Sequence, residues 1–270
     1  MIADVSTLEG CARKVRADVL RMAHAGKAPH VGSALSCTDL LVALYWRVLR
    51  IDPVHPENPQ RDRLILSKGH ASTAQYAALA ERGFFAKSVL EEYARDGGRL
   101  GEHAGPHCVP GIEAATGSLG HGLAIGAGLA LAAKLQSAPY RTFVILSDGE
   151  CYEGSVWEAA LFARPALLDN LVAVVDFNGW SAMACTFETL HPLADKWRSF
   201  GWAVQEIDGH NFDQIVAALE STPYEEYCPS LIVAHTVKGK GVSFMERDLE
   251  WHYRPPSDDD LVRALREIGA

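Results

Sequence analysis

Five short apolar runs recur along this chain of 270 residues, and segments with helical spacing separate them. The runs are the expected strands, at residues 64–67, 142–146, 171–176, 203–207 and 230–236. Apolar strands that alternate with helices favour a parallel sheet with helices on both faces. We therefore predict an α/β fold in which residues 1–270 form one domain, long enough to bury a sizeable core.

Eight stretches have the apolar spacing or the capping residues that are typical of helices. They cover residues 8–25, 38–49, 71–82, 118–134, 155–163, 188–200, 211–220 and a C-terminal segment that starts at Ser257 or Asp258. Two segments between them, 51–63 and 96–111, are rich in proline or glycine and are expected to be loops.

Charge and composition exclude several classes of protein. The net charge is −9 without a block of Lys or Arg, so we expect no nucleic-acid partner. No apolar segment approaches the roughly 20 residues that span a bilayer, so we expect no membrane insertion. The N-terminus lacks the apolar core of a signal peptide, and six scattered cysteines without a C-x-x-C pair predict reduced thiols in a cytoplasmic protein.

Polar residues follow two of the predicted strands at the point where each ends. Asp148 and Gly149 come just after strand 142–146, and Asn178 comes just after strand 171–176. In open α/β sheets ligands sit beyond the carboxyl ends of the strands. Two oxygen ligands that converge there suit Mg²⁺, with a phosphate completing the shell, and Gly149 would let the backbone approach that phosphate. The alternative is an ordinary turn with a solvated Asp and an Asn-Gly.

Histidines form a second group of candidates. His30, His70 and His103 each lie in a glycine-rich loop, and His252 lies in a late loop. Histidine moves protons near neutral pH, which sugar chemistry requires. The alternative for each is a loop histidine bonded to backbone. His210 is expected only to shape the turn into the helix at 211–220.

Several longer motifs occur in order along almost the whole chain and together resemble the transketolase family. The D-G-E-x-x-E-G pattern at 148–154, followed by Asn178, looks like that family's thiamine-diphosphate and metal motif. The other matching segments are PHVGSALS at 29–36, RLILSKGHAS at 63–72, 109–134, LADKWRSFGW at 193–202, EIDGHN at 206–211 and AHTVKGKGVSFME at 234–246. The chain is most similar to the small N-terminal subunits of split transketolases. The resemblance implies a thiamine-diphosphate-binding fold.

The resemblance also implies roles for particular residues. Metal ligands would be the side chains of Asp148 and Asn178 and the carbonyl of Trp180, around Mg²⁺ or else Ca²⁺ or Mn²⁺. Cofactor contacts would come from His70, Gly117, Leu119, Gly149, Glu153 and Asn178. His30, His103 and His252 would serve the sugar channel as catalytic groups. Glu153 would join a carboxylate network between the cofactor sites of the dimer, whereas Glu150 is expected to cap a helix or face solvent. Lys238 and Lys240 either orient a phosphate or belong to a solvated loop.

The resemblance implies that the protein transfers a ketol group from a ketose to an aldose. Its substrates would be sugars or sugar phosphates. The pyrimidine-binding and C-terminal domains of full-length relatives are absent from residues 1–270, so we expect a partner subunit that supplies them and the activating Glu, in a heterotetramer. Alternatives are a subunit of a 1-deoxyxylulose-phosphate-synthase-like or 2-oxo-acid decarboxylating enzyme, and a non-catalytic homologue. Ser147 stands where the family usually has Gly, and segment 179–189 also departs from it.

Overall fold

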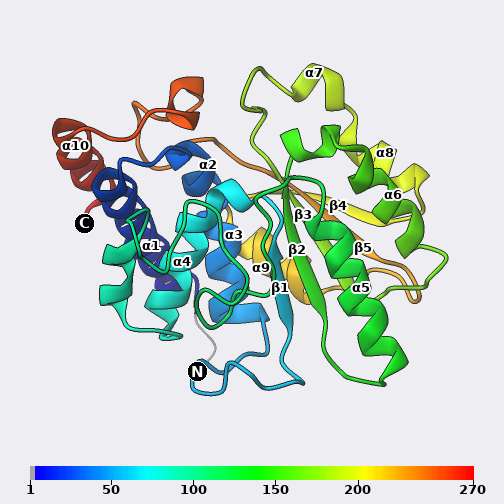
Figure 1. Cartoon of the computed structure of the whole chain (residues 1–270). Helices are drawn as coiled ribbons and strands as arrows, with labels where there is room; N and C mark the ends of the chain where they lie inside the picture. Colours follow the sequence, from blue (N-terminus) through cyan, green and yellow to red (C-terminus); the bar gives the residue numbers. More distant parts are fainter. Residues whose placement is uncertain (1–3) are drawn as a thin grey trace.

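Five parallel strands form one sheet in the computed structural model, which describes residues 4–270 (Figure 1). The strand order is β1-β2-β3-β5-β4. The strands are β1 (Arg63–Leu66), β2 (Thr142–Ser147), β3 (Leu171–Phe177), β4 (Ala203–Asp208) and β5 (Ser230–His235). The predicted α/β class is confirmed, and each predicted strand is found to within one residue at either end. The first three residues of the predicted 1–270 domain lie outside the described residues.

Ten α-helices occur in the described part of the chain. They are α1 (Val5–Gly26), α2 (Val31–Ser36), α3 (Thr38–Ala43), α4 (Ser72–Arg82), α5 (Gly122–Leu135), α6 (Gly154–Ala163), α7 (Phe187–Leu190), α8 (Leu193–Ser199), α9 (Phe212–Glu220) and α10 (Asp258–Ile268). Shorter helical turns are η1 (Leu44–Val48), η2 (Gly69–Ala71), η3 (Lys87–Glu92), η4 (Gly149–Tyr152) and η5 (Leu249–His252). Within residues 4–270, no helix combines the length and apolar character needed to span a membrane.

Helices cover both faces of the sheet, as Figure 1 shows. Successive residues of β2 point to opposite faces, so Phe143 and Ile145 join one buried cluster while Val144 and Leu146 join the other. The first cluster includes residues of α1, α3, α4 and α9, and the second includes residues of α5, α6 and α8. Because β2 and β3 are buried along their whole length, this central pair anchors the turns that follow it.

Three helical predictions were wrong in detail. Residues 31–36, for which no helix was predicted, form α2, and His30, which was expected in a glycine-rich loop, precedes that helix with φ of 71°. The helix predicted at 188–200 is divided into α7 and α8 at Pro192, whose missing N–H cannot continue a helical ladder. The helix predicted from residue 118 starts only at Gly122, which leaves 117–120 as a loop.

Candidate active site

A pocket of about 340 Å³ lies at the carboxyl edge of the sheet. Every residue predicted for the site except Asp148 lines it: His30, His70, His103, Gly117, Leu119, Gly149, Glu153, Asn178, Trp180 and His252. Asp148 is fully buried next to Gly149. The residues come from segments far apart in sequence, and the parallel sheet brings them together because its strand ends share one edge.

Four histidine rings form a cluster in this pocket. The ring centroid of His30 lies 4.8 Å from that of His252, 5.4 Å from His70 and 5.9 Å from His103. The His30 backbone N–H also donates to the His252 carbonyl, at 3.0 Å. The Nδ1 atom of His30 is buried and has no hydrogen-bond partner within the described residues. A buried polar atom without a partner at a pocket wall is suited to a ligand group.

Burial keeps three of these rings neutral. It lowers the pKa of His30 to about 4 and that of His252 to about 3, and it also places the pKa of His70 well below its ordinary value. Nearby cations strengthen the effect, because Lys238 lies beside His252, with Nζ 3.0 Å from Nδ1. Neutral imidazoles can accept a proton at one nitrogen and donate one at the other. The three neutral rings can therefore form hydrogen bonds with substrate hydroxyl groups near pH 7, both as donors and as acceptors.

Asp148 and the segment that follows β3 are joined directly. The Asp148 carboxylate accepts hydrogen bonds from Gly149 N–H at 2.8 Å, Gly179 N–H at 2.7 Å and the Thr186 hydroxyl at 2.7 Å. Asn178 accepts from the backbone N–H of Trp180 at 3.0 Å and donates to Ser36 Oγ at 3.3 Å. The sheet therefore places the predicted acid and amide beside each other.

This donor set fits a divalent cation that carries a diphosphate. Burial raises the pKa of Asp148 to about 6, against the opposing effect of the Thr186 hydrogen bond, so a nearby cation would stabilise its charged form. A Cβ at Gly149 would lie 3.2 Å from Ser181 Cβ, and one at Gly117 would lie 3.3 Å from His103 Cβ. Both glycines thus keep the pocket wall free of side chains where backbone must approach a ligand closely.

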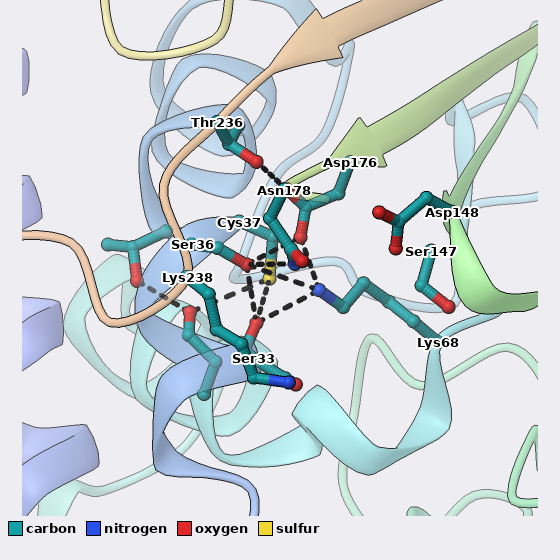
Figure 2. A network of polar contacts seen from close by, with 12 residues as sticks. Ser33, Ser36, Cys37, Lys68, Ser147, Asp148, Asp176, Asn178, Thr236 and Lys238 are labelled. Carbon is teal, nitrogen blue, oxygen red and sulfur yellow. Dashed lines mark hydrogen bonds and ion pairs between the residues drawn. The ribbon is translucent and has the colours of Figure 1, made fainter. Parts of the chain in front are cut away.

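A fully buried ion pair supports the floor of the site (Figure 2). The Lys68 ammonium contacts the Asp176 carboxylate and donates to the Ser33 carbonyl at 2.9 Å. Asp176 also accepts from the hydroxyls of Ser36 and Thr236. Although burial favours the neutral amine, the Asp176 carboxylate raises the pKa of Lys68, so the pair stays charged. The network ties the ends of β1, β3 and β5 to α2.

Glu150 lies inside the protein, which contradicts the prediction that it caps a helix or faces solvent. Its side chain is completely buried and accepts from Ser67 Oγ, from Gly120 N–H at 2.8 Å and from Ser147 N–H at 3.2 Å. Ser147 in turn accepts from the Glu150 N–H at 3.2 Å. The carboxylate thus joins the ends of β1 and β2 to the loop that carries Gly117 and Leu119.

Replacing Glu150 with alanine is expected to destabilise the fold by roughly 2–3 kcal/mol, because three donors lose a charged acceptor. Glu150→Gln should cost less, since an amide oxygen still accepts from Ser67 and Gly120. Urea denaturation of both variants measures the difference. Equal stability of Glu150→Ala and the wild type would contradict the assignment.

Lys238 is also fully buried, so the alternative of a solvated Gly-Lys loop was wrong at this residue. Its Nζ donates to the Ser181 carbonyl at 3.4 Å, and burial together with Lys68 lowers its pKa to about 8. Ser181 belongs to a tight turn between Trp180 and Cys185, which form an isolated antiparallel bridge. The Tyr253 hydroxyl donates to the Ala182 carbonyl at 2.7 Å and holds this turn beside the pocket.

Sequence reasoning missed several residues that line the pocket: Ser33, Ser147, Tyr152, Ser181, Ala182 and Met183. Ser147 was noted only as a departure from the family.

Met183 is 85% exposed at the tip of the turn. The sequence did indicate that residues 181–183 were unusual, because segment 179–189 departs from the family pattern. It did not indicate which conformation this segment adopts. Glu153 is exposed and lines the pocket, and its part in a carboxylate network stays a prediction.

The parallel sheet defines an α/β protein, and its ligand pocket lies at the carboxyl ends of the strands, where proteins of this class bind phosphate-containing ligands. Comparison with known proteins then gives the family. The family model described as "Transketolase, thiamine diphosphate binding domain" matches residues 8–270. The chain belongs to the transketolase family and carries its thiamine-diphosphate-binding domain.

Relatives and solved structures agree with this assignment. The chain is 40% identical to an apulose-4-phosphate transketolase subunit of Phocaeicola vulgatus over 98% of its own length and 95% of that protein. It is 44% identical to the 6-deoxy-6-sulfo-D-fructose transketolase subunit SqwG of a Clostridium species, over 88% of each chain. The transketolase structure from Leishmania mexicana superposes with a TM-score of 0.90 at 27% identity; this chain spans 42% of its length. The chain is accordingly a subunit of a transketolase-type transferase that uses thiamine diphosphate.

Proposed function

We propose that the chain works as the diphosphate-binding half of a two-subunit transketolase that moves a two-carbon ketol group from a ketose to an aldose. The observation that carries this proposal is one pocket that holds a neutral histidine cluster beside the buried Asp148. Relatives named as transketolase subunits match the chain over about nine tenths of their length or more, which supports the split organisation.

In this proposal two groups of residues hold the metal and the cofactor, and a third group acts on the sugars. The side chains of Asp148 and Asn178 and the carbonyl of Trp180 hold Mg²⁺, with Ca²⁺ or Mn²⁺ as substitutes. His70, Gly117, Leu119, Gly149, Glu153 and Asn178 contact the cofactor. When bound, thiamine diphosphate supplies the carbon nucleophile and the electron sink that ketol transfer needs.

His30, His103 and His252 act on the sugars. Their rings meet at one end of the pocket, and His30 and His252 are neutral at pH 7 because burial depresses their pKa values. Each ring can accept a hydrogen bond from one substrate hydroxyl and donate one to another, and in this way the cluster orients the hydroxyl protons that move in general acid–base catalysis. Relatives named for apulose-4-phosphate and for 6-deoxy-6-sulfo-D-fructose support sugars or sugar phosphates as the substrate class.

The partner in the proposal is a chain that supplies the pyrimidine-binding domain and its activating Glu, in a heterotetramer with two copies of each chain. A cofactor held between two chains stabilises their association by mass action. Six free cysteines among the described residues support a reducing compartment, for which we propose the cytoplasm.

The chain alone, supplied with thiamine diphosphate and Mg²⁺, is expected to be inactive. Addition of a partner chain that carries the pyrimidine-binding domain should give ketol transfer from a ketose or ketose phosphate to an aldose or aldose phosphate. The measurement is product formation with each chain alone and with both together. Full activity of this chain by itself would refute the two-subunit proposal.

The same assay separates the alternatives. Release of CO₂ from a 2-oxo acid by the mixed chains, without ketol transfer, would favour the 1-deoxyxylulose-phosphate-synthase-like or decarboxylating reaction. Calorimetry that detects no thiamine diphosphate binding to the mixture would favour a non-catalytic homologue. The transketolase family match and the complete histidine cluster are the reasons to expect neither.

A further inference from the structure

A cluster of three buried or half-buried side chains, Arg16, Asp39 and His210, lies in contact with the segment that carries Lys238. Asp39 Oδ2 is 2.7 Å from an Arg16 guanidinium nitrogen and 2.7 Å from His210 Nδ1. The cluster lines a second pocket, of about 660 Å³, together with residues of α1 and α9. None of its members lines the pocket of the active site. Its function was not apparent from sequence, which assigned His210 only to a turn.

The cluster holds the chain on both sides of Lys238. The Val237 N–H donates to His210 Nε2 at 2.8 Å, and Arg16 Nε donates to the Lys240 carbonyl at 3.2 Å. Lys238 lies between these two contacts, and its Nζ reaches His252 and Ser181 in the active-site pocket. The positions of Val237 and Lys240 therefore determine the position of the Lys238 amine.

These contacts also fix the protonation of His210. A backbone N–H can only donate, so Nε2 must present its lone pair to Val237, and the ring proton lies on Nδ1 facing Asp39. Although burial opposes ionisation of Asp39, the Arg16 guanidinium holds the pKa of that carboxyl below its ordinary value, so Asp39 is an acceptor. If Nε2 of His210 carried a proton, that N–H would face the Val237 N–H, and the hydrogen bond between them would be lost.

We propose that His210 is a positioning residue for the active site. Its neutral imidazole, oriented by Asp39, fixes the segment from Val237 to Lys240 and so sets the position of the Lys238 amine and the His252 ring that it contacts. Gly239 N–H supports the same segment by donating to the Gly32 carbonyl of α2 at 2.9 Å. The role of His252 toward the sugar rests on the proposed function.

The charged groups around His210 come from every element that packs on it. They are Asp39 from α3, Glu9, Arg13 and Arg16 from α1, Asp208 from β4, Asp213 from α9, and Lys240 from the loop after β5. Asp39 stabilises an added positive charge on the ring, while Arg16 and the Val237 N–H oppose it.

Two substitutions test the proposal in the full chain. His210→Phe removes both hydrogen bonds, whereas His210→Gln can still accept from Val237 and donate to Asp39. His235→Gln is the matched control, because His235 lies two residues before Val237 and is exposed. Its ring hydrogen-bonds to the exposed Glu206 at 3.0 Å and packs against Phe177, and neither contact reaches Val237.

Hydrogen exchange at Val237 is the first readout and does not depend on cofactor. His210→Phe should exchange about tenfold faster, the factor that one backbone hydrogen bond of ordinary net strength supplies. His210→Gln and His235→Gln should exchange at the wild-type rate. Unchanged exchange in the Phe variant, or exchange in the Gln variant as fast as in the Phe variant, would overturn the proposal. If His210→Phe does not fold, His210→Asn takes its place, because its side chain is polar but too short to reach Val237, and the same tenfold acceleration is expected.

Cofactor affinity and kinetics of the complex with the partner chain are the second readout. His210→Phe should weaken thiamine diphosphate binding about tenfold or lower kcat by a similar factor, with recovery in His210→Gln. Faster exchange at Val237 with unchanged affinity and kcat would overturn the positioning role and leave the proposed function intact. A wild-type complex without any cofactor affinity would instead overturn the proposed function.

Discussion

Replacing Asp148 with alanine is expected to abolish metal-dependent binding of thiamine diphosphate, with at least about a 100-fold rise in Kd, or ~2.7 kcal/mol. The carboxylate is the one charged ligand in the proposed metal set. It also accepts from Gly149 and Gly179, so its loss frees the backbone on both sides of the site. Calorimetry of the complex with and without a chelator measures the effect.

Thr186→Val is the matched control for that experiment. It removes the hydroxyl that donates to Asp148 at 2.7 Å but leaves the carboxylate in place. Residues that orient a metal ligand typically change affinity by roughly 10–100-fold, and we expect the lower end because two backbone donors remain. The ligand assignment would be refuted if Asp148→Ala bound thiamine diphosphate with wild-type affinity, or if the chelator left the affinity of the wild type unchanged.

Replacing Lys68 with methionine is expected to destabilise the protein by roughly 3–5 kcal/mol, because it leaves the fully buried Asp176 carboxylate without its cation. For a chain of this size the midpoint of thermal unfolding should fall on the order of 10 °C. Differential scanning calorimetry of the full chain gives both values.

The double variant Lys68→Met/Asp176→Asn should recover more than half of that loss. It leaves no unpaired charge, and the Asn oxygen can still accept from one of the two hydroxyls, Ser36 or Thr236, which donate to different oxygens of Asp176. The exposed pair Arg198–Asp195 provides a contrast, because Arg198→Ala should cost less than about 1 kcal/mol. A Lys68→Met variant as stable as Arg198→Ala would show that the buried pair does not support the site.

The strands were predictable because burial on both faces leaves an uninterrupted apolar run, and β2 and β3 have no exposed position. The helix α2 was not predictable by periodicity, since all six of its residues are buried and no polar face breaks the pattern. Pro192 marked the division between α7 and α8, but the apolar spacing on both sides of it concealed the break.

The residues that line the pocket were largely predictable as a set, whereas their contacts were not. Strand ends and glycine-rich turns indicated where Asp148, Asn178 and the histidines would meet. The buried positions of Glu150 and Lys238 depend on segments distant in sequence: Gly120 donates to the first, and Gly32 leaves room for the second, since a Cβ there would lie 3.2 Å from Lys238 Cγ. Local charge patterns contain no information about such partners.

The backbone of His30 has a consequence for how this position can vary. Its φ of 71° lies in the left-handed region, which costs a residue with a Cβ roughly 1 kcal/mol and a glycine almost nothing. Glycine or asparagine would therefore relax the chain at this point but remove the ring that touches three other imidazoles. At residue 30, therefore, stability favours glycine or asparagine, whereas catalysis favours histidine. We expect a relative with a small residue at this position to have lost catalytic activity.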